Sequence, residues 1–292
     1  MSTKFSLSAE AIIPRSLHYC WFGRNKKPDL AQFCISTWRT HCPNFQIIEW
    51  NEDNFDISAF PVAAAAYEQK KYAFVTDLVR AHVLYTHGGI YLDTDVEIRR
   101  DLSAFLEHRA FIGFERSGIP FTAVWGSVAK HALAQAILNH YSTALVDEII
   151  DVPNTVFISK LLQDRFGVDP NSDELQKCAD DLVIYPSNIF CLDLPENYAT
   201  HHFAGSWVAV KESINYSQIA LAYFYLDALR KLERQGVVIS NSRELIASDR
   251  EQLKWHAKKI REVLLRVIRR RVRTAGRRTR RIFKGIGMHG RG

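Results

Sequence analysis

Two aspartates, Asp93 and Asp95, directly follow an apolar run in the stretch from His87 to Ile98. Residues i and i+2 of an extended strand point to the same side, so the two carboxylates should aim together if the extended conformation continues. Paired carboxylates resist burial and repel each other unless a positive group is present. A hard divalent cation such as Mn²⁺ or Mg²⁺ suits them and often shares its ligand shell with phosphate oxygens. The pattern predicts a cation site with affinity for a diphosphate, although an isolated Asp-x-Asp is more often a solvated turn.

A second charged pair, Asp77 and Arg80, lies three residues apart in the preceding helical pattern and therefore shares one helix face. An ion pair on an open surface contributes little to stability. This pair, however, has apolar residues on several sides. We therefore expect it to face a pocket rather than open water.

Strand and helix patterns alternate through the first half of the chain. Apolar, β-prone runs predict strands over residues 17–22, 45–51, 90–98 and 110–115. Helical spacing predicts helices over 29–42, 72–89 (with Gly88-Gly89 as the stop), 131–145 and 217–235. Segments 182–190 and 201–208 are expected to be later strands or loops. The alternation favours an α/β fold with a mostly parallel sheet, whose ligand crevice lies at the carboxyl ends of the strands.

Three sequence blocks resemble glycosyltransferase family 32, the Asp-x-Asp sugar transferases that include yeast mannosyltransferases and bacterial capsule and lipopolysaccharide enzymes. They resemble the clostridial glucosylating toxins more distantly. The central block matches a pattern of Ser/Thr-Asp, Arg, and Tyr-x-x-Gly-Gly-x-Tyr-x-Asp-x-Asp, at residues 76–95. Ile13 to Gly23 matches Ile-Pro-x-x-Ile-His-x-x-Trp-Phe-Gly, and His201 to Trp207 matches His-His-x-x-Gly-Ser-Trp. Together the blocks cover roughly residues 12 to 210.

The resemblance implies a GT-A fold, which is Rossmann-like with a mostly parallel central sheet. It would occupy residues 1–240, followed by a basic, helical extension over 241–292. It also implies a divalent cation, Mn²⁺ or Mg²⁺, held by Asp93, Asp95 and His202. Asp93 and Asp95 would engage both the metal and the ribose, with Asp95 the more direct metal ligand.

The remaining site residues are implied in the same way. Asp77 and Arg80 would bind the hydroxyls of the donor sugar and the diphosphate, and Trp21 would stack on the nucleobase. His202, Ser206 and Trp207 would close over the diphosphate. With Asp95, the pair Asp77 and Arg80 forms the expected catalytic set.

The implied reaction transfers a hexosyl group from a nucleotide diphosphate sugar, with UDP favoured over GDP, to a hydroxyl of a glycan acceptor. The resemblance implies retention of the anomeric configuration. No carboxylate nucleophile is identified in the sequence, so we favour front-face attack in which the leaving phosphate takes the acceptor proton. Cell-surface polysaccharide or lipopolysaccharide synthesis is the expected setting.

Three other functions stay open. One is a transferase that modifies a protein. Another is a phosphohydrolase of the haloacid dehalogenase type, which would need Thr or Val where Glu97 stands. The last is an inactive, transferase-like binding protein.

Three features depart from the family pattern. Thr122 and Ala123 stand where the family often has Asn, Val152-Pro153 replaces a Gly-Pro pair, and the segment 184–193 lacks the usual Tyr-Pro after its Phe. We expect these segments on the acceptor side, away from the donor site.

Composition divides the chain into two parts. Residues 250–292 contain sixteen Lys and Arg against two Asp and Glu, whereas the preceding residues carry a net charge of −8. A basic amphipathic helix in the tail is expected to bind an anionic membrane surface, which would suit a lipid-linked glycan acceptor. Packing of this helix on the enzyme body is the alternative, and nucleic-acid binding is not expected.

Cysteine usage and the N-terminus bear on location. The five cysteines form no Cys-x-x-Cys pair and are expected to be free thiols. The N-terminus lacks the long apolar core of a secretory signal, so export by that route is not expected. We therefore expect a cytoplasmic protein, peripheral on the inner face of the cytoplasmic membrane.

Overall fold

A computed structural model describes residues 12–116, 119–143, 154–169, 171–194, 196–204 and Arg234 of the 292 residues. The chain divides into two compact units, residues 1–228 and 229–292, and every described residue except Arg234 belongs to the first. The predicted boundary between residues 240 and 241 and the basic extension lie outside the described residues. So does the predicted helix 217–235, apart from Arg234.

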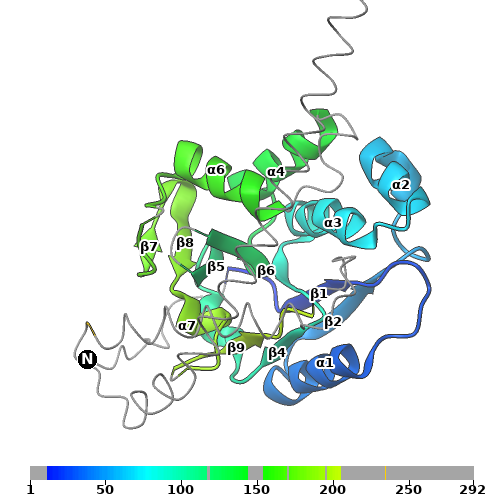
Figure 1. The fold of residues 1–292 in the computed structure, drawn as a ribbon. Coiled ribbons are helices and arrows are strands. Elements are labelled where there is room, and N and C mark those ends of the chain that lie inside the picture. Colours follow the sequence, from blue (N-terminus) through cyan, green and yellow to red (C-terminus); the bar gives the residue numbers. More distant parts are fainter. Residues whose placement is uncertain are drawn as a thin grey trace, which may run out of the picture. The chain divides into compact units, whose positions relative to one another are not determined.

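A twisted sheet forms the centre of the first unit (Figure 1). In the described residues its strand order is β2-β1-β3-β6-β5-β8-β7. The strands are β1 (Ser16–Cys20), β2 (Gln46–Trp50), β3 (Gly89–Leu92), β5 (Ala110–Arg116), β6 (Ile119–Ser127), β7 (Gln176–Lys177) and β8 (Leu182–Tyr185). β2, β1, β3, β5 and β8 run in one direction, whereas β6 and β7 run in the other. The predicted α/β fold with a mostly parallel sheet is confirmed.

Helices cover both faces of this sheet (Figure 1). One face carries α2 (Pro61–Glu68), α3 (Tyr72–His87), α4 (Ala132–Thr143) and α6 (Asn154–Phe166). The other face carries α1 (Asp29–His41), α7 (Ser187–Phe190) and a small sheet of β4 (Val96–Ile98) and β9 (Ala199–His201). Short 3-10 turns occupy Ile57–Ala59, Leu102–Phe105 and Ala179–Asp181. Each face has its own apolar cluster, as expected for a three-layer α/β fold.

The strand predicted over residues 90–98 is broken in the structure. β3 ends at Leu92, and a turn closed by a 3.0 Å hydrogen bond from Val96 N to Asp93 O leads into β4. The extended conformation therefore does not continue through Asp93 and Asp95. The turn moves the chain from the central sheet to the small one.

β6 holds the end of β3 in place. It pairs antiparallel with β3, from Gly89 opposite Ser127 to Leu92 opposite Val124, and Ala123 O accepts a 2.9 Å hydrogen bond from Asp93 N. This strand was not predicted from the sequence. On the other side of β6, Gly126 lets the Phe111 ring of β5 pack closely against the strand, since a Cβ at Gly126 would lie 2.0 Å from Phe111 Cε1.

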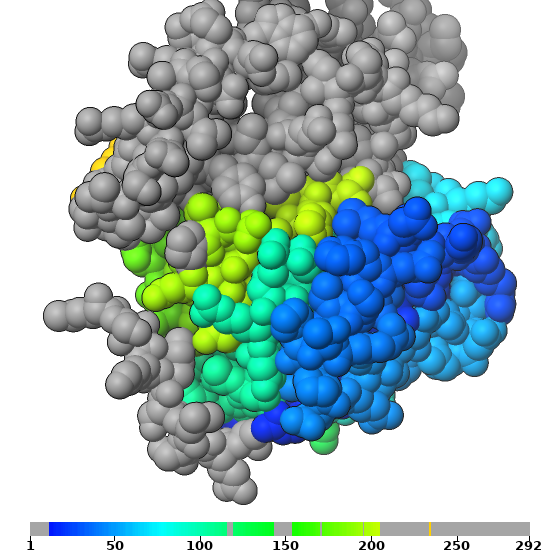
Figure 2. Space-filling model, turned by 90° about the horizontal axis from the view of Figure 1, so that it is seen from below, coloured from blue at the N-terminus to red at the C-terminus, as the bar shows by residue number. Residues whose placement is uncertain are grey.

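The surface in Figure 2 shows how distant segments meet. Blue-green residues of the middle of the chain lie between the blue N-terminal segment and the yellow-green segment that ends the described residues. The contacts between α1 and β4 and the pairing of β4 with β9 agree with this view, because they join the same three segments.

None of the helices in the described part of the chain combines the length and apolar character needed to cross a membrane. All five cysteines are free, as predicted.

Candidate metal and sugar-donor site

The Asp-x-Asp turn is anchored by a strand more than 100 residues later in the chain. β4 pairs antiparallel with β9, so that Val96 lies opposite His201. Beyond this pair, Asp95 O accepts a 2.9 Å hydrogen bond from His202 N, and Asp95 Oδ2 accepts one of 2.8 Å from Ala204 N. The small sheet therefore places a histidine segment beside the two aspartates.

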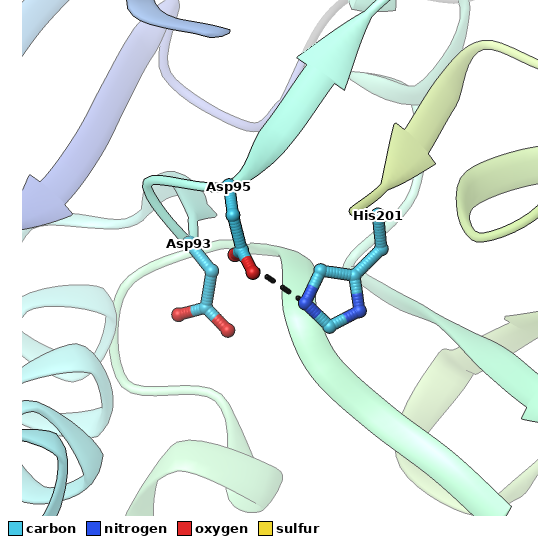
Figure 3. A group of neighbouring side chains, drawn as sticks. All are labelled: Asp93, Asp95 and His201. Atoms are coloured by element: carbon cyan, nitrogen blue, oxygen red, sulfur yellow. Dashed lines mark ion pairs between the residues drawn. The ribbon is translucent and has the colours of Figure 1, made fainter. Parts of the chain in front are cut away.

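Asp93, Asp95 and His201 form a group that could hold a metal ion. One ligand atom from each of the three residues lies within 4.8 Å of the others, and the side chains point into a common space (Figure 3). His201 Nε2 is 3.3 Å from Asp95 Oδ1, and His201 Nδ1 is buried with no hydrogen-bond partner among the described residues. Two carboxylates and an imidazole fit the ligand preference of Mn²⁺. The aspartates converge as predicted, although a turn rather than strand alternation brings them together.

Asp95 and His201 influence each other's ionisation. Burial disfavours the charged form of each group, but their mutual attraction outweighs it. The pKa of Asp95 falls to about 2, and the pKa of His201 rises to about 8. Both groups are thus charged at pH 7, so a metal ion bound through His201 must displace its proton.

Arg80 lies where the charges of the site converge. Its Nη2 is 3.0 Å from Asp77 Oδ1 and 3.3 Å from Asp93 Oδ1, and its guanidinium lies 4.8 Å from the centre of the Tyr91 ring. The side chains of Arg80 and Asp77 are 8% and 9% exposed, so this pair is not the surface ion pair that we considered from sequence. Within the part of the chain that the structure describes, the buried Arg80 Nε has no hydrogen-bond partner.

The ionisation of Asp77 and Arg80 follows from this burial. Burial raises the pKa of the Asp77 carboxyl to about 6, although Arg80 opposes the shift. For Arg80, burial favours the neutral form, but the charges of Asp93 and Asp77 outweigh it and raise the pKa of the guanidinium. Arg80 therefore stays cationic inside the site.

Two further side chains meet this pair. Arg80 Nη1 donates to Thr122 Oγ1 at 2.9 Å, and Asn154 Nδ2 donates to Asp77 Oδ1 at 2.6 Å. The expectation that the Thr122 segment lies away from the donor site was wrong. Because β6 runs antiparallel beside β3, it carries Thr122 past the end of that strand to Arg80.

His202 lies next to the cluster but contacts a different carboxylate. Its Nε2 is 2.9 Å from Glu97 Oε2, and Glu97 Oε1 is also 3.1 Å from Arg99 Nε. The structure thus places His201, rather than His202, at the position where we predicted a histidine ligand. Neighbouring strand residues point to opposite sides, so only one of the two can face Asp95.

The predicted base-stacking residue, Trp21, lies at the end of β1 and is partly exposed. Its indole Nε1 donates to Asn25 O at 2.6 Å, and Lys27 Nζ lies 5.7 Å from the ring centre. Its stacking role stays a prediction. Ser206 and Trp207 lie outside the described residues.

Comparison with known proteins identifies the central part of the chain. Residues 28–112 match the family described as "Glycosyltransferase sugar-binding region containing DXD motif", where DXD denotes Asp-x-Asp. This region is similar to the DXD glycosyltransferases. The match contains Asp77, Arg80, Asp93 and Asp95, so the family resemblance predicted from the sequence is confirmed.

Two curated proteins similar to this chain come from Schizosaccharomyces pombe. Inositol phosphoceramide mannosyltransferase 3 is 30% identical over 110 residues, which cover 35% of this chain and 30% of the relative. Inositol phosphoceramide mannosyltransferase 1 is 28% identical over 138 residues, which cover 44% of this chain and 42% of the relative. The chain therefore spans less than half the length of either relative.

One of the solved structures to which this chain is similar is that of the PaToxG glycosyltransferase. It is 15% identical to this chain with a TM-score of 0.39, and the alignment covers 52% of this chain and 70% of that one.

Four residues at the site were not predicted from sequence: His201, Glu97, Thr122 and Asn154. The doubled histidine and the Thr122 departure were visible signals, but choosing between His201 and His202 requires strand register. Nothing in the sequence around Asn154 indicated that it reaches Asp77, 77 residues earlier.

Proposed function

We propose that this protein is a metal-dependent, retaining glycosyltransferase that moves a hexose from a nucleotide diphosphate sugar to a hydroxyl of a glycan acceptor. The observation that carries the proposal is the placement of Asp93, Asp95 and His201 within 4.8 Å of one another, beside the buried cation of Arg80. The family match supports sugar transfer as the class of reaction.

The donor would lie along the carboxyl end of the sheet. Trp21 follows β1, Asp93 follows β3, and Thr122 lies on β6, so the three mark successive positions across neighbouring strands. We infer that Trp21 stacks on the base, preferably uracil, that the aspartates lie beside ribose and diphosphate, and that the sugar lies toward Asp77. An indole face stacks on any base, so the preference for UDP over GDP rests on the resemblance.

The difficult charge in this reaction develops on the departing diphosphate. A divalent cation held by Asp93, Asp95 and His201 would supply positive charge there. Arg80 stays protonated inside the site and can donate to a diphosphate oxygen or a sugar hydroxyl. Asp77 can accept a hydrogen bond from a sugar hydroxyl and so orient the ring.

Retention is proposed to follow front-face attack. The acceptor hydroxyl approaches on the side from which the diphosphate leaves, the sugar passes through an oxocarbenium-like state, and the leaving phosphate oxygen takes the acceptor proton. Such a route needs orientation of both substrates more than it needs a protein nucleophile.

The acceptor and the location are proposals as well. The names of the relatives suggest mannose as a candidate sugar and an inositol-bearing lipid as a candidate acceptor. A lipid-linked glycan acceptor would suit a cytoplasmic enzyme held on the inner face of the cytoplasmic membrane by its basic tail. A role in polysaccharide or lipopolysaccharide synthesis fits the same location.

A thermal-shift screen of UDP- and GDP-sugars with Mn²⁺, followed by hydrolysis of the best binder, tests the proposal. The wild type should be stabilised and should release sugar, whereas Asp95→Ala and Arg80→Ala should lose most of the hydrolysis. Full activity in either variant would contradict this use of the site. If no nucleotide sugar binds, the protein is better explained as an inactive, transferase-like binding protein, and burst release of phosphate from simple esters would indicate the phosphohydrolase.

A further inference from the structure

Asp77 and Arg80 are also held by side chains from outside α3 and the aspartate turn. Asn154, the first residue of α6, donates its amide to Asp77 Oδ1 at 2.6 Å. Thr122 of β6 offers its hydroxyl to Arg80 Nη1 at 2.9 Å, and its carbonyl oxygen lies 3.3 Å from the same nitrogen. Two elements that the family match at residues 28–112 does not include therefore complete the surroundings of this pair.

These contacts leave a defined set of atoms for a ligand. Asp77 Oδ1 receives both Asn154 and Arg80, whereas Oδ2 has no hydrogen-bond partner among the described residues. A carboxylate with one oxygen bound on both sides cannot rotate freely. Asp77 Oδ2 is thus held ready to accept a hydroxyl.

Position along the sheet indicates which part of the donor meets this pair. Trp21 and the Asp93 turn lie at the ends of β1 and β3, and Thr122 lies on β6, the next strand in the order. A nucleotide diphosphate sugar with its base at Trp21 and its diphosphate at Asp93 would place its sugar at Asp77, Thr122 and Asn154.

We propose that Asn154 and Thr122 are positioning residues for the sugar of the donor, acting through Asp77 and Arg80, and that they help to determine which hexose is accepted. This inference rests on the proposed function. Selectivity between hexoses can depend on one hydroxyl, because a buried group built to bind it is left unpaired by the wrong isomer. Thr122 lies at one of the positions where the chain departs from the family pattern, which suits a role in selectivity.

The test compares Asn154→Ala and Thr122→Val with the wild type and with Asn171→Ala, an exposed asparagine in the loop before β7. Two quantities are measured with Mn²⁺: the Kd of UDP and GDP, and kcat/KM for hydrolysis of UDP-glucose, UDP-galactose, UDP-N-acetylglucosamine and GDP-mannose. We expect both site variants to keep the nucleotide Kd within about twofold. They should lose about tenfold or more in kcat/KM, the usual effect of losing a hydrogen bond to a charged group. Their ranking of the sugars should also change.

Nucleotide binding shows that each variant is folded. Unchanged hydrolysis and sugar ranking in both variants would overturn the inference while leaving the proposed function intact. An equal loss of nucleotide binding and hydrolysis would also overturn it, because the two residues would then support the whole site. Wild-type protein that binds no nucleotide would refute the proposed function itself.

Discussion

At the scale of single residues, the site solves a charge problem. Three carboxylates lie in this region, those of Asp77, Asp93 and Asp95. Arg80 pairs with Asp77 and Asp93, and His201 pairs with Asp95. A metal ion would add to this positive charge rather than provide all of it. Side chains of the protein itself therefore offset part of the repulsion between Asp93 and Asp95.

The two histidines of the His-His block should differ in metal binding. His201 lies with Asp93 and Asp95, whereas His202 contacts Glu97. His201→Ala should weaken Mn²⁺ binding by about tenfold or more, and His202→Ala should have a smaller effect, of the kind expected when a neighbouring support is lost. Calorimetric titration with Mn²⁺ in the presence of UDP measures both. A larger loss in His202→Ala would show that the ligand assignment is reversed.

His18 makes the stability of the fold depend on pH. Burial lowers the pKa of this imidazole from 6.5 to about 4, against the opposing effect of its hydrogen bond with Gly88 O. The folded state thus keeps His18 neutral, while the unfolded chain takes up a proton below pH 6.5. About 3 kcal/mol of stability should be lost as the pH falls from 6.5 to 4.

Urea unfolding of wild type and His18→Gln at pH 4.5 and 7 checks this. Glutamine can still donate to Gly88 O but does not titrate, so the variant should lose less stability on acidification. An identical pH dependence in the two proteins would contradict the assignment to His18.

At the scale of elements, the turn between α3 and β3 sets the start of the aspartate strand. Gly88 and Gly89 both have positive φ, and a Cβ on Gly89 would lie 2.6 Å from His18 Nε2. The glycine pair of the family signature is therefore explained here by packing beside β1. His18, the histidine of the first block, also bonds to this glycine pair, because its Nε2 lies 2.9 Å from Gly88 O.

Gly89→Ala should destabilise the protein by about 2 kcal/mol or more and weaken Mn²⁺ binding, because strain and clash act together on β3. Gly167→Ala is the matched control, since Gly167 also has positive φ but its added Cβ would have no atom of the other described residues within 4 Å, apart from its chain neighbours. That variant should lose only about 1 kcal/mol and keep metal binding. Thermal unfolding and manganese titration of both variants measure the difference, and equal effects would contradict the packing argument.

Much of the fold could be predicted from the sequence because local signals were strong. β1, α1, β2, α3, β5 and α4 lie where periodicity and glycine stops placed them. β6 and α6 were missed, and with them Thr122 and Asn154, because their roles depend on antiparallel pairing and packing between distant segments. The aspartates and Arg80 were found because the family signature is contiguous, whereas the choice of His201 depends on register.

At the scale of the whole molecule, the acidic body and the basic tail should have different partners. Full-length protein should float with anionic vesicles at low salt, and a chain that ends near Asn241 should not, because the residues before that point are net acidic and the net positive charge lies beyond it. Hydrolysis of a soluble donor should be the same in both. Equal flotation of the two forms would remove the membrane role of the tail.

The pairing of β4 with β9 has a consequence for synthesis. The aspartates emerge from the ribosome about 100 residues before the histidine strand that joins them. Domains acquire long-range contacts only after the later segment is made. A nascent protein would therefore carry both aspartates for some time without a complete pocket, and a metal ion held by all three side chains could bind only after His201 has been made.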